Sequence, residues 1–277
     1  MNRLSFEKRT QIINILVEGN SLRATSRIAD CSINTVTKLL IQVGTACAEY
    51  LDKHVKNVKS KRVQCDEIWS FVYAKQKNVP ESMKQQSGVG DVWTWTALDS
   101  DSKLIISYLV GLRNADCAKI FMEDVASRLA NRVQLTTDGL KAYLEEVDQV
   151  FGVDIDYAQL VKIYGACPEG EIRYSPAECT GAKKEIVTGY PIKKDISTSH
   201  VERQNLTMRM GMRRFTGLTN AFSKKIANHE HAIALHFMYY NFVRIHKSLR
   251  VTPAQAADLT TKLWNVEDLV KLTDSQQ

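Results

Sequence analysis

The feature that most constrains the fold of this chain is a change of periodicity at Arg62. Before this residue, apolar side chains recur at helical spacing. After it, the segments 63–73, 92–98 and 103–110 are rich in β-branched and aromatic residues, and 92–98 alternates apolar with polar positions. The polar stretch Asp99–Ser102 is typical of a turn between the second and third segments. Together the segments predict a meander of three antiparallel strands.

The segments that follow predict alternating helices and strands. Helical spacing extends over 115–130 and 140–150, and short strand-like runs occupy 133–137 and 155–163. Three antiparallel strands followed by helix, strand, helix and strand is the order of the RNase H fold. We therefore predict an α/β chain with an RNase H-like mixed sheet flanked by helices. Further helices are expected at 198–212 and 221–245.

The N-terminal region has the pattern of a helix-turn-helix. Ser5 and Ser21 are placed to cap two successive helices, Gly19 ends the first of them, and a third helix follows the turn at 30–32. Polar residues near the start of a third helix of this kind face base edges in the major groove. A plain three-helix packing unit is the alternative interpretation. The DNA contacts expected from this region are Arg23, Arg27, Asn34, Thr35 and Lys38.

These patterns divide the chain into four parts. We expect an all-α helix-turn-helix domain over 1–54, a basic linker over 55–62, an RNase H-like catalytic domain over 63–257 and a C-terminal tail over 258–277. Within the catalytic domain, 165–196 has little periodicity and several Gly and Pro residues, and it is interpreted as an inserted loop. Two cysteines of this part, Cys167 and Cys179, lack the second pair that a zinc ribbon needs.

Charge is distributed unevenly along the chain. Residues 1–62 contain eleven Lys or Arg and five Asp or Glu, residues 63–202 contain fifteen against twenty-one, and residues 203–250 contain nine against one. This pattern favours polyanion binding at the flanks and cation binding in the middle, with solvated helix faces as the alternative. Because no apolar window is long enough for a membrane span, we expect a cytoplasmic, nucleoid-associated protein.

Three acidic residues are candidates for catalysis. Asp66 lies in an apolar strand, where a buried carboxylate needs a partner or a metal. Asp138 directly follows the predicted strand 133–137, although Asp before Gly also makes turns. Glu202 lies three residues after Ser199, a spacing that also fits a helix capping box. Taken singly each acid is ambiguous, but the three positions converge at one edge of an RNase H sheet.

Three segments carry a resemblance to a known family. CDEIWSFV (65–72), TTDGLKAY (136–143) and SHVERQNLTMRMGMRRFTGLTNAFSKK (199–225) resemble the DDE transposases of bacterial insertion sequences, of the insertion-sequence-one type. YNFVRIHKSL (240–249) and TPAQAA (252–257) are similar to the wider transposase and integrase superfamily, which has an RNase H-like catalytic domain. Members often carry a cysteine zinc ribbon ahead of the helix-turn-helix. This sequence has none before residue 5, so end recognition is expected from residues 1–62.

The resemblance implies a function and a site. It implies metal-dependent DNA cleavage and strand transfer at the ends of an insertion sequence, with Asp66, Asp138 and Glu202 as catalytic metal ligands. Two Mg²⁺ or Mn²⁺ ions would be held roughly 3.5 to 4 Å apart, because hard oxygen ligands suit these ions. The partners would be double-stranded DNA, at transposon ends and target, and further copies of this chain in a homo-oligomer on DNA.

Glu67 is an alternative ligand beside Asp66. Adjacent strand residues point to opposite faces, so we expect only one of them to join the cluster, and we choose Asp66 on the family match. Asn205 and Arg209 share a helix face with Glu202 and could reach DNA near the metals. The remaining DNA contacts predicted around this helix are Arg203, Arg209, Arg213, Arg214, Lys224 and Lys225.

Two other classes of protein remain open at this point. A nuclease with an RNase H fold would use the same carboxylates without joining DNA ends. An inactive, transposase-derived DNA-binding regulator would need residues 1–62 but no acids.

Overall fold

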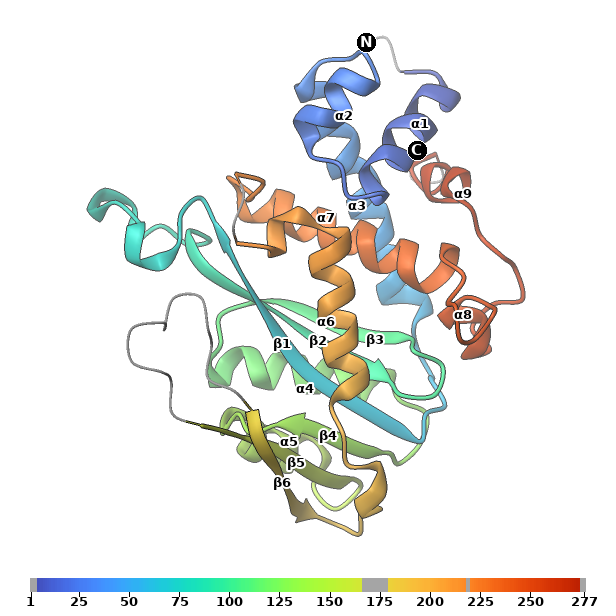
Figure 1. Ribbon diagram of the computed structural model, residues 1–277. Coiled ribbons are helices and arrows are strands. Elements are labelled where there is room, and N and C mark those ends of the chain that lie inside the picture. Colours follow the sequence, from blue (N-terminus) through green and yellow to red (C-terminus); the bar gives the residue numbers. More distant parts are fainter. Residues whose placement is uncertain (1–3, 166–178, 218–219, 275–277) are drawn as a thin grey trace.

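The N-terminal region consists of three helices. The computed structural model describes residues 4–165, 179–217 and 220–274. Its first helices are α1 (Phe6–Val17), α2 (Leu22–Ile28) and α3 (Ile33–His54) (Figure 1). Ser5, Ser21 and Ser32 each accept a hydrogen bond from a backbone N–H of the first turn, which satisfies a donor that has no partner within the helix. The caps predicted at Ser5 and Ser21 are confirmed.

The centre of the molecule is a six-stranded mixed sheet with the order β3-β2-β1-β4-β5-β6. Strands β1, β2 and β3 form the expected antiparallel meander, β4 pairs parallel to both β1 and β5, and β6 pairs antiparallel to β5. The strands are β1 (Arg62–Val72), β2 (Gly90–Asp99), β3 (Ile105–Gly111), β4 (Gln134–Asp138), β5 (Asp156–Tyr164) and β6 (Cys179–Thr188). The predicted mixed α/β sheet and its first five strands are confirmed.

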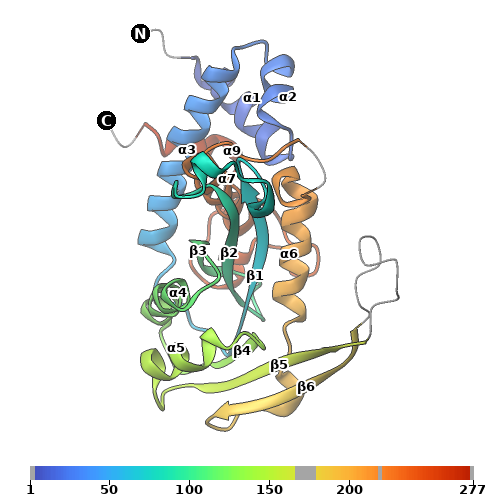
Figure 2. The same ribbon diagram turned by 90° about the vertical axis from the view of Figure 1, so that its left-hand side faces the viewer.

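Helices cover both faces of the sheet. Figure 2 shows α4 (Ala115–Arg128) and α5 (Ala142–Phe151) on one face and α6 (Ser199–Gly211) on the other. Trp95 of β2 packs under the first pair, with its ring 5.8 Å from that of Phe121 and 5.5 Å from that of Tyr143. The sequence order and the two-faced helix cover match the RNase H-like arrangement that the sequence predicted.

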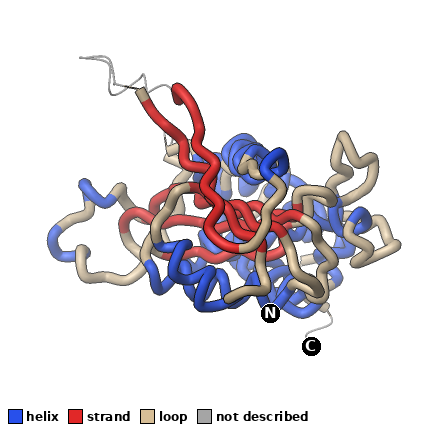
Figure 3. The backbone as a smooth tube through the Cα atoms, turned by 90° about the horizontal axis from the view of Figure 1, so that it is seen from below, coloured by secondary structure: helices blue, strands red, loops and turns tan. Residues whose placement is uncertain are grey.

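The segment 165–196 is not a simple loop, and this part of the prediction is wrong. It contains β6, which extends away from the body of the sheet with β5 (Figure 3). Most β6 side chains are exposed on both faces, so the strand lacks the apolar alternation that would have revealed it. Residues 166–178, including Cys167, lie outside the described part of the chain.

The predicted helix 221–245 is also divided. The structure has α7 (Ile226–Met238), followed by a π-helical turn over Tyr239–Val243. In this turn the Asn241 side chain accepts a hydrogen bond from Ile105 N at 3.0 Å and donates one to Ile105 O at 2.9 Å. The turn therefore places an amide against the outer edge of β3. Two short helices follow, α8 (Pro253–Ala256) and α9 (Val266–Lys271), and short 3-10 turns occur at Gln76–Asn78, Glu81–Met83, Lys193–Asp195 and Arg213–Phe215.

The N-terminal helices share an apolar core with the sheet. Helix α3 crosses α7 so closely that a Cβ on Gly44 would lie 2.6 Å from the backbone oxygen of His231. Helix α9 packs near α1, where Arg9 forms an ion pair of 2.9 Å with Asp274. Buried apolar residues from Ile12 to Val270 form one cluster. None of the helices in the described part of the chain has both the length and the apolar character that crossing a bilayer requires.

Candidate active site

Two neighbouring acids of β1 point to opposite faces of the sheet. Asp66 faces α6, and its Oδ2 accepts a hydrogen bond of 2.9 Å from Nδ2 of Asn205. Glu67 faces α5, where the hydroxyl of the buried Tyr143 donates to its Oε1. Because side chains alternate along a strand, one acid lies against each of the two helix layers.

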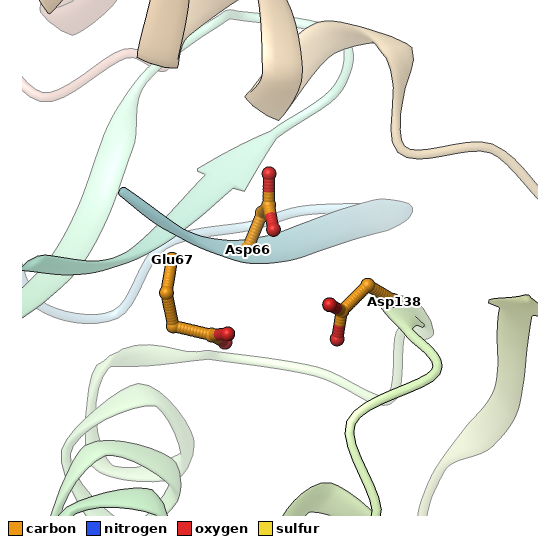
Figure 4. A group of neighbouring side chains, drawn as sticks. All are labelled: Asp66, Glu67 and Asp138. Atoms are coloured by element: carbon orange, nitrogen blue, oxygen red, sulfur yellow. The ribbon is translucent and has the colours of Figure 1, made fainter. Parts of the chain in front are cut away.

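The third acid lies at the end of the adjacent parallel strand. Asp138 is the last residue of β4. Its Oδ1 also accepts a hydrogen bond of 3.0 Å from Leu140 N, so Asp138 makes the turn that an Asp before Gly indicates. Asp66, Glu67 and Asp138 each place one carboxylate oxygen within 4.8 Å of the others (Figure 4).

The expectation that only one of Asp66 and Glu67 could join the cluster is therefore wrong. Their side chains leave opposite faces of β1, as predicted, but Glu67 is longer and bends beneath the strand toward Asp138 (Figure 4). The alternation of side chains along a strand fixes the direction of each Cβ, whereas the length of the side chain decides how far its carboxylate reaches.

Glu202 approaches from α6 but is not in this group of three. Its Oε2 forms an ion pair of 2.8 Å with Nζ of Lys162 on β5, and its Oε1 accepts a hydrogen bond from the hydroxyl of Thr198. Thr198, not Ser199, is the N-cap residue, and it makes no capping hydrogen bond to the backbone. The capping-box alternative for Glu202 is therefore not what the structure shows. Backbone N–H groups of His200 and Val201 instead donate to Gln64 of β1, which seats the helix on the sheet.

Two basic side chains that the sequence did not single out neutralise the acids. Arg113, in the loop after β3, donates from Nε to Glu67 at 3.0 Å and from Nη2 to Asp138 at 3.1 Å. Lys162 plays the same role for Glu202. A lysine in the apolar run of β5 was a usable signal for Lys162. No spacing pointed to Arg113, because it depends on a loop returning to the sheet edge.

Burial and mutual repulsion raise the pKa values of the two β1 acids. The pKa of Asp66 is raised to about 6, first by burial and then by the charge of Asp138, with a smaller contribution from Glu202. The pKa of Glu67 is raised to about 7, again by burial and then by Asp138, although Tyr143 and Arg113 oppose the shift. The fold therefore brings more negative charge together than its own basic residues compensate.

The donor set fits a hard divalent cation. All of the clustered ligands are carboxylate oxygens, which Mg²⁺ and Mn²⁺ prefer. Asn205 adds a second observation, because its Oδ1 is buried without a hydrogen-bond partner while its Nδ2 holds Asp66. An orphaned acceptor beside excess carboxylate is what a cation, or its water, would satisfy.

Most of the side chains predicted to contact DNA are on the surface. Thr35 is half-buried and hydrogen-bonds with the Ser32 hydroxyl. Arg214 is half-buried and turns inward, donating to Ser223 Oγ at 2.6 Å and to Asn228 O at 3.2 Å. Its guanidinium thus binds the segment before α7 and the first turn of α7, which argues against a role in contacting DNA. The exposed members are Arg23, Arg27, Asn34, Lys38, Arg203, Arg209, Arg213, Lys224 and Lys225.

Comparison with known proteins gives structural likenesses only. No family model and no curated protein sequence matches the chain. The synaptic complex of a piggyBac transposase with hairpin DNA matches with a TM-score of 0.44 and 11% identity, over 98% of this chain and 70% of that one. A pre-cleavage Mos1 transpososome matches with a TM-score of 0.27 and 8% identity, over 96% and 82%. A Mos1 transposase paired-end complex with the left transposon end matches with a TM-score of 0.24 and 11% identity, over 57% and 60%. At these values we draw no conclusion about function from the likenesses.

Proposed function

We propose that this chain is a DDE-type DNA transposase of the insertion-sequence kind, a polynucleotidyl transferase that cleaves and joins DNA strands with Mg²⁺ or Mn²⁺. The observation that carries the proposal is the convergence of Asp66 and Asp138 where β1 and β4 lie side by side, with Glu202 of α6 near enough for its charge to raise the pKa of Asp66. Such a cluster of hard, partly uncompensated carboxylates suits phosphoryl transfer, in which cations at the site stabilise the attacking and leaving oxygens.

The three ligands would be Asp66, Asp138 and Glu202, with Glu67 in support. Glu67 is held by Tyr143 and Arg113, and its side chain is only 1% exposed, so it is fixed in place and reaches solvent little. Asp66, Asp138 and Glu202 are more accessible, with the side chains of Asp138 and Glu202 28% and 36% exposed. Accessible carboxylates can bind ions together with a DNA phosphate, whereas Glu67 is better placed to orient Asp138 through Arg113.

The chain's own residues prepare the site for this chemistry. Asn205 fixes the Asp66 carboxylate, and Gln64 anchors the first turn of α6, so Glu202 is held on a rigid helix. Arg113 and Lys162 neutralise Asp138 and Glu202, and cation binding would exchange these ion pairs for metal contacts. The exposed basic residues of α6 and of the N-terminal helices are proposed to bind the DNA phosphates, and further copies of the chain would join two DNA ends.

The decisive test is strand transfer in vitro with purified protein, labelled terminal-repeat DNA and a target plasmid in Mg²⁺ or Mn²⁺. We expect metal-dependent joining, and we expect Asp138→Asn to reduce it by more than about a hundredfold, because changing even an outer partner of a metal ligand costs 10- to 100-fold. Asp148→Asn on α5 is a matched control that should remain active. Cutting without joining would identify a nuclease instead, and an active Asp138→Asn protein would overturn the site.

A further inference from the structure

A cavity lies on the flank of α6 that faces away from the acid cluster. It has a volume of about 490 Å³ and is lined by residues of α6, β2, the β2–β3 turn, and the π-helical turn with the loop after it. Its basic lining residues are Lys103, His200, Arg203, Arg244, His246 and Lys247. Among the described residues, this lining includes no Asp or Glu.

The geometry of α6 separates this cavity from the acid cluster. At about 100° per residue, Asn205 and Arg209 lie within roughly 60° of Glu202 around the helix axis, whereas His200, Arg203, Gln204 and Thr207 lie roughly 100° to 200° away. These four residues line the cavity, and Asn205 binds Asp66. One helix therefore presents Glu202 and Asn205 to the acid cluster, and His200 and Arg203 to the cavity.

One of the residues that line the cavity has a buried donor with no partner. Gln204 is 2% exposed, and its Nε2 has no hydrogen-bond partner. Leaving a buried amide donor unsatisfied costs about 1 to 3 kcal/mol, so such donors are retained where a ligand or water completes them. Because the surrounding groups are cationic, the ligand that would complete this one is an acceptor with negative charge.

The cavity is positively charged. Nζ of Lys103 donates a hydrogen bond of 3.2 Å to Nε2 of His200, which accepts it as a neutral imidazole. The pKa of His246 is lowered, first by burial and then by the charges of Lys103 and Arg244. The nearby carboxylate of Asp101 is engaged by Arg62. An oxyanion in the cavity would be attracted by the charges of Lys103 and Arg244.

We propose that the cavity binds phosphate groups of a DNA strand, which makes it a second DNA-binding site separated from the acid cluster by the width of α6. The inference rests on the proposed function, because it takes DNA to be the substrate. A helix is about 10 to 12 Å across with its side chains, so DNA held here would lie beside the strand at the acids and not in their place.

The test is DNA binding by the full chain in EDTA, where no strand chemistry takes place. A fluorescein-labelled duplex is titrated at increasing salt, because the logarithmic salt slope counts neutralised phosphates, at about 0.9 for each one. We expect Arg244→Gln/Lys247→Gln to weaken binding and to reduce this slope by about two. Lys119→Gln/Lys141→Gln removes the same charge from the opposite face and should leave the slope unchanged. Equal slopes for wild type and the first variant would overturn the proposal.

Gln204→Leu provides a test that does not change charge. It removes the unpartnered donor, so we expect no loss of stability and roughly tenfold weaker DNA binding, as for one hydrogen bond to a charged acceptor. Unchanged binding would overturn the assignment of Gln204.

A third experiment distinguishes a DNA phosphate from free phosphate as the ligand of the cavity. The melting temperatures of wild type and of Arg244→Gln/Lys247→Gln are measured with and without inorganic phosphate. If phosphate stabilises only the wild type, and the salt slopes of DNA binding are equal for the two proteins, the cavity binds free phosphate and the DNA assignment is overturned. Since binding is measured without metal, failure of this site leaves the strand-transfer proposal intact, and failure of strand transfer leaves this result intact.

Discussion

At the scale of single residues, the adjacent acids Asp66 and Glu67 lie in two different environments. Asp66 is half-buried against α6 and bound by an amide, while Glu67 is buried against α5 and bound by a phenol and a guanidinium. Their carboxylates nevertheless meet near Asp138. The site is therefore assembled from both helix layers, and a change in either layer would alter the acids.

The raised pKa of Glu67 predicts how stability depends on pH. In the folded chain its pKa is about 7, against 4.5 ordinarily, so between these values the folded state binds a proton that the unfolded state has lost. Ionising Glu67 in the fold thus costs stability, which is highest below about pH 4.5 and falls as the pH rises through 7.

We expect Glu67→Gln to remove this dependence. Between about pH 4 and about pH 8 in EDTA, its free energy of unfolding should gain about 3 kcal/mol relative to wild type, at about 1.4 kcal/mol per pKa unit. Urea unfolding at each pH measures the difference. The exposed Glu123→Gln on α4 should follow the wild type, and a parallel pH dependence of Glu67→Gln and wild type would contradict the prediction.

At the scale of elements, the crossing of α3 and α7 depends on one glycine. A Cβ at Gly44 would lie 2.6 Å from both Cβ and the backbone oxygen of His231, a distance that requires the two helices to move apart. Overpacking of this kind costs about 1 to 3 kcal/mol, which outweighs the gain of up to about 1 kcal/mol from the better helix propensity of alanine.

Gly44→Ala should therefore destabilise the chain by roughly 1 to 2 kcal/mol in chemical denaturation. Gly211→Ala is a matched control on α6, because its Cβ would meet Cε1 of His236 at an ordinary 3.4 Å. We expect the control to be neutral or slightly stabilising. Equal effects at the two glycines would show that the α3–α7 contact is looser than described.

At the scale of the whole molecule, the N-terminal helices and the sheet form one packed body. Arg128 of α4 donates to the carbonyl oxygens of Leu51 and Val55, and it pairs with Asp52 at 2.7 Å. Val58, in the segment expected as a linker, is fully buried and forms a bridge with Leu129. These contacts join the last turns of α3 and the segment after it to the C-terminal end of α4, which covers one face of the sheet.

We therefore expect a single cooperative unfolding transition. Hydrogen exchange followed by mass spectrometry across a urea series should give the same midpoint for peptides of α1 to α3 and of β1 to β3. An independent N-terminal domain, as the division at residue 54 implies, would give two separate midpoints.

Local patterns were sufficient for the helix caps and for the strands inside the fold. The caps at Ser5 and Ser21 were predicted from the residue type at the start of each helix, and the strands β1 to β5 from short runs rich in apolar, β-branched and aromatic residues. Strand β6 was missed because most of its side chains are exposed on both faces. The π-helical turn was missed because its cause, the bond between Asn241 and Ile105, joins residues 136 positions apart.

The sequence by itself determined the order of the strands β1 to β5 and of the helices between them, and with it the position of three acids on β1, at the end of β4 and on α6, because these elements leave a local pattern in the sequence. Only the tertiary structure decided that Glu67 joins the cluster, that Arg113 and Lys162 neutralise it, and that α6 separates it from a basic cavity. Those contacts depend on how far side chains reach between elements distant in the chain. The pattern of residues within a short segment does not show which distant elements its side chains will contact.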